Sequence, residues 1–237
     1  QWEGNCSFDW FDNELPQLTE WLPTFQIARY ETTNAQYQEC VSAGYCSPVA
    51  PTSSDGSMVW DPRYAGANYP VVGIAQGDAS RFCAWVGGSL PTDAQWEKAA
   101  RGPDGNRFPW GDTLPDSTLA MFGQHHVHEI PILAPVSSGE AGKSYYGVHH
   151  MAGNVAEWVN DWFGFDYYAY MPERNPPGPT SGRSGVFPSD YKVPQQGLCL
   201  LLAAMVSGWH RPVWPCRLAP AVRTDRRYSL RSVRRYG

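Results

Sequence analysis

The sequence predicts an irregular α+β domain with few long elements of regular structure. Hydrophobic residues make up 42% of the 237 residues and charged residues 17%, so the chain can bury a sizeable core. Its 23 glycines and 21 prolines interrupt almost every segment, which argues against many long helices. The 11 tryptophans and 13 tyrosines indicate a core packed largely from aromatic side chains. No long linker or internal repeat divides the chain, so residues 1–237 are expected to form a single domain.

The first predicted elements are a strand and a helix that follow one another directly. The strand begins at Ile27 and leads into a Thr-Thr-Asn run. A helix is expected from Thr33 or Asn34, because these side chains accept backbone N–H groups at helix starts. Gly44 ends the helix, and residues 47–69 have the composition of a loop.

A short strand and a second helix come next. Residues 70–74 are apolar and short, which favours a strand. Apolar side chains then recur at helical spacing between residues 76 and 86, and Gly87-Gly88 ends that helix.

The third helix has the clearest start and end signals. Thr92 is the expected N-cap, and Gln95 three residues later completes a capping box. Gly102 closes the helix. Its buried stripe is expected to consist of Trp96, Ala99 and Ala100.

The charge distribution excludes some classes of partner. A formal net charge of −5 argues against a general binder of nucleic acids or of anionic membranes. The basic residues nevertheless gather near the end, where eight lie between Arg211 and Arg235. No stretch is long enough to span a membrane, since the most apolar one, 198–206, has about half the required length. The chain starts at Gln1 rather than Met, so we expect a processed or cut form.

Six cysteines leave their pairing open. They contain no CxxC pair, which argues against a zinc ribbon. Cys40 and Cys46 could close a short disulfide in an oxidising compartment, or they could be two buried thiols. We expect an extracytoplasmic or secreted location for the chain.

The third helix belongs to a longer motif, Leu90-Pro-Thr-Asp-Ala-Gln-Trp-Glu-Lys-Ala-Ala-Arg-Gly, which precedes a Pro109-Trp-Gly-Asp turn. Other motifs occur in order around it: Glu31-Thr-Thr-Asn-Ala-Gln-Tyr, Pro70-Val-Val-Gly with the helix from Ala79 to Trp85, Tyr146-Gly-Val-His-His-Met-Ala-Gly-Asn-Val-Ala-Glu-Trp, and Asn175-Pro-Pro-Gly-Pro-Thr-Ser-Gly. Together they resemble the sulfatase-modifying-factor (formylglycine-generating-enzyme-like) family. The resemblance covers residues 30–182 and implies a C-type-lectin-like fold with little regular secondary structure.

The resemblance also implies an oxidase reaction, for which the required cysteine pair is not evident. The family's enzymes use oxygen, and in aerobic forms copper on two cysteines, to convert a substrate cysteine to formylglycine. With His210 and Arg211 aligned to the family motif, Trp209 takes the place of the first cysteine. Only Cys216 lies near the second, and Cys199 is 17 residues upstream. Because a lone thiol cannot form a two-thiolate copper site, copper is expected only if Cys216 and Cys199 act together.

The same segment suggests a binding function instead. Trp209, His210, Arg211 and Trp214 could stack on a ligand and hold it through the guanidinium, or they could fill the core. The first hypothesis is therefore a non-catalytic binding or accessory module for a peptide or other polar ligand. The alternative is a formylglycine-generating oxidase that acts on a cysteine of a sulfatase-type substrate. The sequence does not predict the oligomeric state.

Residues 185–237 diverge from the family pattern, and three explanations are open. The segment could belong to a paralogue with a rebuilt pocket. It could be a diversified tail, as in the variable proteins of diversity-generating retroelements. A reading-frame shift near residue 185 would also explain its excess of Arg, Pro and Trp.

Metal binding is the last functional expectation. The family resemblance implies a calcium loop with the Glu157 carboxylate and the backbone oxygens of Gly153 and Val155 as ligands. The upstream ligand position holds His150, whose nitrogen suits a hard cation poorly. The family's second calcium loop has Met121 at its usual Asn position. A transition-metal site is a further alternative, built from His125, His126 and His128 with His149 and His150.

Overall fold

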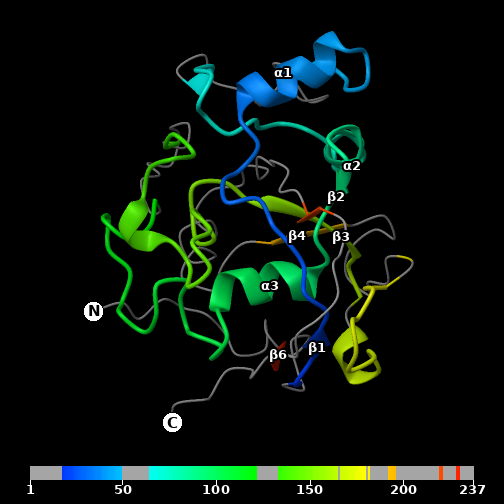
Figure 1. Cartoon of the computed structure of the whole chain (residues 1–237), viewed down its shortest axis with the longest axis vertical. Helices are drawn as coiled ribbons and strands as arrows, with labels where there is room; N and C mark the ends of the chain where they lie inside the picture. The colour runs from blue at the N-terminus through cyan, green and yellow to red at the C-terminus, as the bar shows by residue number, and fades with distance from the viewer. Residues whose placement is uncertain are drawn as a thin grey trace.

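The structure is a computed structural model of the whole chain. It describes residues 18–49, 64–121, 133–164, 166–179 and 181, together with three short strands at 192–195, 219–220 and 228–229. Figure 1 shows these elements in an irregular arrangement around one central helix, α3.

Short helices and strands alternate with long irregular segments, so the α+β prediction is confirmed. In the described part of the chain, two-stranded antiparallel sheets pair β1 with β6, β2 with β5, and β3 with β4. The elements in chain order are β1 (Trp21–Leu22), α1 (Asn34–Ser42), α2 (Gln76–Trp85), β2 (Gly88–Ser89), α3 (Asp93–Arg101), η3 (Glu140–Gly142), β3 (Glu157–Trp162), η4 (Tyr167–Ala169), β4 (Lys192–Gln195), β5 (Ala219–Pro220) and β6 (Tyr228–Ser229).

All three predicted helices are present at the expected places. The Thr33 side chain accepts the N–H of Gln36, and the Gln36 side chain accepts the N–H of Thr33, which forms a capping box at α1. Thr92 and Gln95 form the same reciprocal pair at α3. The α3 capping box could be predicted because it depends only on two residues three positions apart.

The two predicted strands near the N-terminal end are wrong. The chain is irregular from residue 23 to 28, and the strand lies earlier, at Trp21–Leu22. Between 70 and 74 the only ladder contact is an isolated bridge between Thr33 and Pro70. Val71 and Ile74 are buried as in a strand, at 1% and 4% exposure, but this segment packs against the chain before α1 without joining a sheet.

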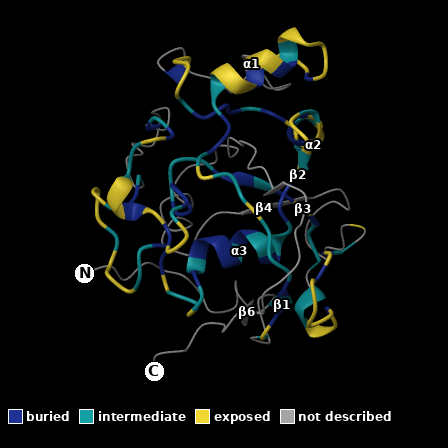
Figure 2. Cartoon of the chain, viewed as in Figure 1, coloured by how far each residue is buried: buried dark blue, intermediate teal, exposed yellow. Residues whose placement is uncertain are grey.

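The core is divided between two main clusters. One joins α1 and α2 through Tyr37, Cys40 and Phe82. The other lies between α3 and β3 and contains Trp96, Ala99, Ala100, Val148, Met151 and Val159, so the predicted stripe of α3 is buried. Figure 2 shows this difference, with α3 mostly buried and α1 exposed along its outer side.

The packing of α3 against β3 positions the functional residues described below. Asn160 of β3 donates its backbone N–H to the Pro91 carbonyl at 2.8 Å. The carboxylate of Asp161 accepts the backbone N–H of Asp93, the first residue of α3, at 2.9 Å. An aspartate near a helix start also interacts favourably with the helix dipole.

Candidate functional site

The turn before β3 contains the residues predicted to bind calcium, and its backbone is strained. His150 and Asn154 have φ values of 53° and 61°, in the left-handed region that few side chains adopt. Gly153 has φ 96°, and a Cβ atom there would lie 2.3 Å from the Met121 carbonyl oxygen. Only glycine fits between this turn and residue 121.

The side chain of Asn154 holds the turn against two distant segments. Its Oδ1 accepts the N–H of Ala134 at 2.8 Å, and its Nδ2 donates to the Glu31 carboxylate at 2.9 Å. The backbone N–H of Asn154 also donates to the Met121 carbonyl at 3.0 Å. Glu31 is 1% exposed, so this bond supplies a buried carboxylate with a donor.

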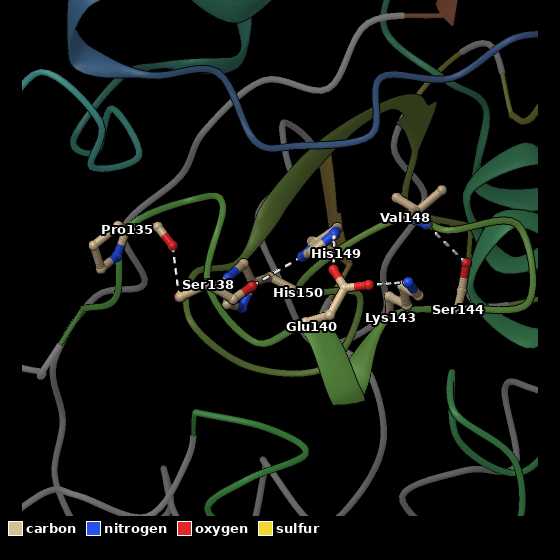
Figure 3. Close-up of polar contacts among 8 residues, drawn as sticks. All are labelled: Pro135, Ser138, Glu140, Lys143, Ser144, Val148, His149 and His150. Carbon is tan, nitrogen blue, oxygen red and sulfur yellow. Dashed lines mark hydrogen bonds and ion pairs between the residues drawn. The ribbon is translucent and has the colours of Figure 1, made fainter.

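The two histidines of the turn contact the loop 135–143, as Figure 3 shows. His149 Nδ1 lies 2.9 Å from the Ser138 carbonyl oxygen, and its Nε2 lies 3.5 Å from the Glu140 carboxylate. The same carboxylate is paired with Lys143. His150 Nε2 lies 3.3 Å from the Ser138 hydroxyl.

Glu157 is fully buried and contacts a partner that the sequence did not indicate. The indole Nε1 of Trp96 donates to Glu157 Oε2 at 2.6 Å. The turn therefore offers one engaged carboxylate, one imidazole and backbone oxygens, a set that fits calcium poorly because calcium takes six to eight oxygen ligands.

Transition-metal binding gains no support from the described part of the chain. Within those residues, no three His, Cys, Asp or Glu side chains are arranged to hold a metal ion. His125, His126 and His128 lie outside the described residues, so the predicted histidine site stays a prediction.

The cysteines of the described segments are all in disulfides. Cys40 and Cys46 are bonded to each other across the short loop after α1, which decides the alternative left open by the sequence. Cys83 is also disulfide-bonded, to a partner outside the described residues. The remaining candidate residues, namely Cys199, Cys216, Trp209, His210, Arg211 and Trp214, lie outside the described residues as well.

A group of acidic side chains between α3 and β3 forms a pocket that the sequence reasoning missed. We call it the acid pocket; the polar residues that line it in the described part of the chain are Glu20, Asp93, Glu97, Asp161, Tyr167 and Tyr168. The Tyr168 hydroxyl donates to Asp93 Oδ2 at 3.0 Å. Gly178 packs so closely against Asp161 that a Cβ atom on it would lie 2.1 Å from Asp161 Oδ1.

Burial and mutual repulsion make the acids of this pocket hard to ionise. Burial, followed by the charges of Glu97 and Asp161, raises the pKa of Glu20 from 4.5 to about 7. Burial, followed by Asp161 and Glu97, also raises the pKa of Asp93 well above its usual value. The Asp93 charge and then burial raise the pKa of the Tyr168 hydroxyl. Burial raises the pKa of Tyr167, while the nearby Gly178 amide lowers it.

Comparison with known proteins identifies the family. Residues 2–200 match the model of the sulfatase-modifying factor enzyme 1-like domain. The chain belongs to this family. The sulfatase-modifying-factor family predicted from the sequence motifs is thereby confirmed.

Curated relatives of this family member include enzymes of different kinds. The formylglycine-generating enzyme of Mus musculus is 37% identical over 208 residues, which is 77% of this chain and 53% of that protein. The hercynine oxygenase of Mycolicibacterium smegmatis is 30% identical over 243 aligned positions, 85% of this chain and 53% of that protein. The chain spans 37% of YfmG from Bacillus subtilis and 19% of the kinase pkn1 from Chlamydia caviae.

Solved structures of other proteins share the fold. PvdO from Pseudomonas aeruginosa has a TM-score of 0.56 at 18% identity and covers 88% of this chain and 93% of its own. The Treponema denticola variable protein 1 has a TM-score of 0.53 at 19% identity, with 84% and 85% covered. At these identities the likeness shows the fold alone, and it confirms the C-type-lectin-like architecture of the sulfatase-modifying-factor family member. Among the described residues of this chain, no helix is both long and apolar enough to cross a membrane.

Proposed function

We propose that this family member is a non-catalytic binding or accessory module for a peptide or other polar ligand. The observation that carries the proposal is the tryptophan at position 209, where the family's oxidase needs its first thiol. Family membership does not decide between binding and catalysis, because one fold hosts several functions.

The disulfides support the proposal by limiting the number of thiols. Cys40, Cys46 and Cys83 are all disulfide-bonded, and Cys83 takes a partner from the remaining three cysteines. At most two of Cys6, Cys199 and Cys216 can therefore be thiols. A copper site of the oxidase kind needs both thiolates of a close pair, so it survives only if Cys83 is bonded to Cys6.

The same disulfides support an extracytoplasmic location, since structural disulfides persist in oxidising compartments. The ligand of the module would contact Trp209, His210, Arg211 and Trp214. Replacement of Arg211 by alanine should then weaken binding of an acidic or polar peptide without lowering the melting temperature.

A copper titration with a thiol count tests the central proposal. The oxidised protein is mixed with Cu(I), its thiols are counted under denaturing conditions, and a cysteine-containing sulfatase-type peptide is assayed for aldehyde formation. We expect no retained copper and no aldehyde. Stoichiometric Cu(I) binding that is lost in Cys216→Ala but kept in the double variant Cys40→Ala/Cys46→Ala, together with aldehyde formation, would establish the oxidase alternative.

A further inference from the structure

Three buried oxygens of the acid pocket lack a hydrogen-bond partner within the part of the chain that the structure describes. They are Glu20 Oε2, Asp93 Oδ1 and Tyr167 Oη. Glu20 is only 6% exposed, so bulk water has little access to its carboxylate. A buried acceptor without a donor costs about 1–3 kcal/mol, and more when it is charged. The two carboxylate oxygens need donors that the described residues do not supply, and the Tyr167 hydroxyl beside them can accept as well as donate.

The missing donors should be positively charged. Glu97, at the edge of the pocket, is paired with Arg101 at 2.7 Å. For Glu20 and Asp93, the described ranges supply no Lys or Arg partner, although Asp161 adds a further acid nearby. The raised pKa values of Glu20 and Asp93 reflect the same lack of a positive charge, because a cation in the pocket would lower both pKa values.

The size of the pocket favours a compact cation over a bulky one. The enclosed space between the lining side chains is about 10 Å³, which is room for a group the size of one water molecule. No group of three acidic, His or Cys side chains in the described ranges is placed for a metal ion. An ammonium nitrogen bonds to oxygens at about 2.8 Å, farther than a metal ligand distance, and it carries three N–H donors. Its donors match the three open acceptors in number.

We propose that the acid pocket binds the primary ammonium group of a ligand, with Glu20, Asp93 and Tyr167 as its acceptors. The inference rests on the proposed binding function and adds a ligand chemistry to it. A lysine side chain of a peptide and a small free alkylamine both present this group. The pocket lies between α3, β3 and η4, and its described lining residues run from Glu20 to Pro176.

Thermal unfolding of the full chain at pH 8 with added n-butylamine tests the proposal. We expect a saturable rise of the melting temperature. 1-Butanol, which lacks the charge, and tetramethylammonium, which lacks N–H donors, should give no saturable rise at the same ionic strength. N-acetyl-lysine methylamide distinguishes the sources: binding at least as tight as that of butylamine assigns a peptide lysine, and weaker or no binding assigns a free amine.

Matched variants connect the response to the pocket. Glu20→Gln should weaken butylamine binding on the order of tenfold or more, because it removes the charge that the ammonium contacts. Glu39→Gln makes the same substitution on the exposed face of α1 and should leave binding unchanged. If Glu20→Gln does not fold, the native chain still provides a test: its affinity for butylamine should fall as the pH drops from 8 to 5, because protons compete for Glu20.

Three outcomes would overturn the proposal. One is the absence of a saturable response in the native chain, and another is an equal response to tetramethylammonium. The third is a ligand-free Glu20→Gln variant that melts below the native chain at pH 8, because a cation of the protein itself would then occupy the pocket. None of these outcomes affects copper binding or aldehyde formation, so failure of this inference is distinct from failure of the proposed function.

Discussion

Asn154 offers the sharpest test of how the turn before β3 is held. Replacement by alanine removes the bonds from its side chain to Ala134 and to the buried Glu31 carboxylate. It also places a Cβ-bearing residue without a polar side chain at φ 61°. A bond to a charged group contributes about 1.5–3 kcal/mol, a neutral bond about 1 kcal/mol, and the left-handed backbone costs an alanine about 1 kcal/mol.

Because these contributions overlap, we expect Asn154→Ala to lower the free energy of unfolding by about 4 kcal/mol. For a chain of this size, that corresponds to a fall of about 10 °C in melting temperature. Urea unfolding followed by tryptophan fluorescence, with the disulfides intact, measures the loss. Asn68→Ala is the matched control, because the Asn68 side chain is exposed, and it should change stability by less than about 0.5 kcal/mol.

Asn154→Asp separates hydrogen bonding from simple loss of volume. The aspartate keeps an acceptor for Ala134 but faces the Glu31 carboxylate with a second negative charge in place of the N–H donor. We expect a loss as large as that of Asn154→Ala at pH 8, and a partial recovery near pH 4, where a shared proton relieves the repulsion. An aspartate variant as stable as the native chain at pH 8 would refute this account of the turn.

Four further predictions follow from single contacts. Gly178→Ala should lower the free energy of unfolding by more than about 2 kcal/mol, because its Cβ would collide with Asp161 Oδ1. Gly44 has the same φ of 76° but open space around it, so Gly44→Ala should lower the free energy by only about 1 kcal/mol in the same urea unfolding experiment. Trp96→Phe should lower the free energy of unfolding by about 2–4 kcal/mol, because it removes the donor to the buried Glu157. Glu157→Gln keeps an acceptor for Trp96 and should lower it by less. Calcium or EDTA should leave the melting temperature unchanged, and a saturable rise with calcium would assign Glu157 to a metal. Glu20 binds its proton more tightly in the folded state, so stability should fall by at most about 3 kcal/mol as the pH rises from about 4.5 to about 7, and Glu20→Gln should flatten this dependence in a pH series of melts.

The features that the sequence could predict are those set by near neighbours. Thr92 and Gln95 lie three residues apart, and Cys40 and Cys46 lie six apart, so local spacing was sufficient to foresee the cap and to propose the disulfide. The ordered motifs predicted the family, and the family in turn implied the C-type-lectin-like fold. None of this required knowledge of which distant segments meet.

The features that were missed depend on long-range packing. Glu157 finds its donor on Trp96, 61 positions earlier, so no local pattern could name the pair. The acid pocket likewise joins Glu20, Asp93 and Asp161 from three separate segments. The 70–74 segment has the composition of a strand, but among the described residues it forms only the isolated bridge from Pro70 to Thr33. Strand propensity describes a half-buried extended chain and does not supply a sheet for it to join.

The distribution of satisfied and unsatisfied polar atoms indicates where a ligand should be sought. Where the turn before β3 meets the loop 135–143, the drawn side chains of Ser138, Glu140 and His149 each have a partner within the protein (Figure 3). Such a network stabilises the turn and leaves a ligand little to replace. The acid pocket has the opposite character, since carboxylates of Glu20 and Asp93 are buried at a cost that a bound cation would reverse. A cation there would bridge α3 to the chain before β1. Binding of a ligand cation should therefore stabilise α3 and the chain before β1 against unfolding.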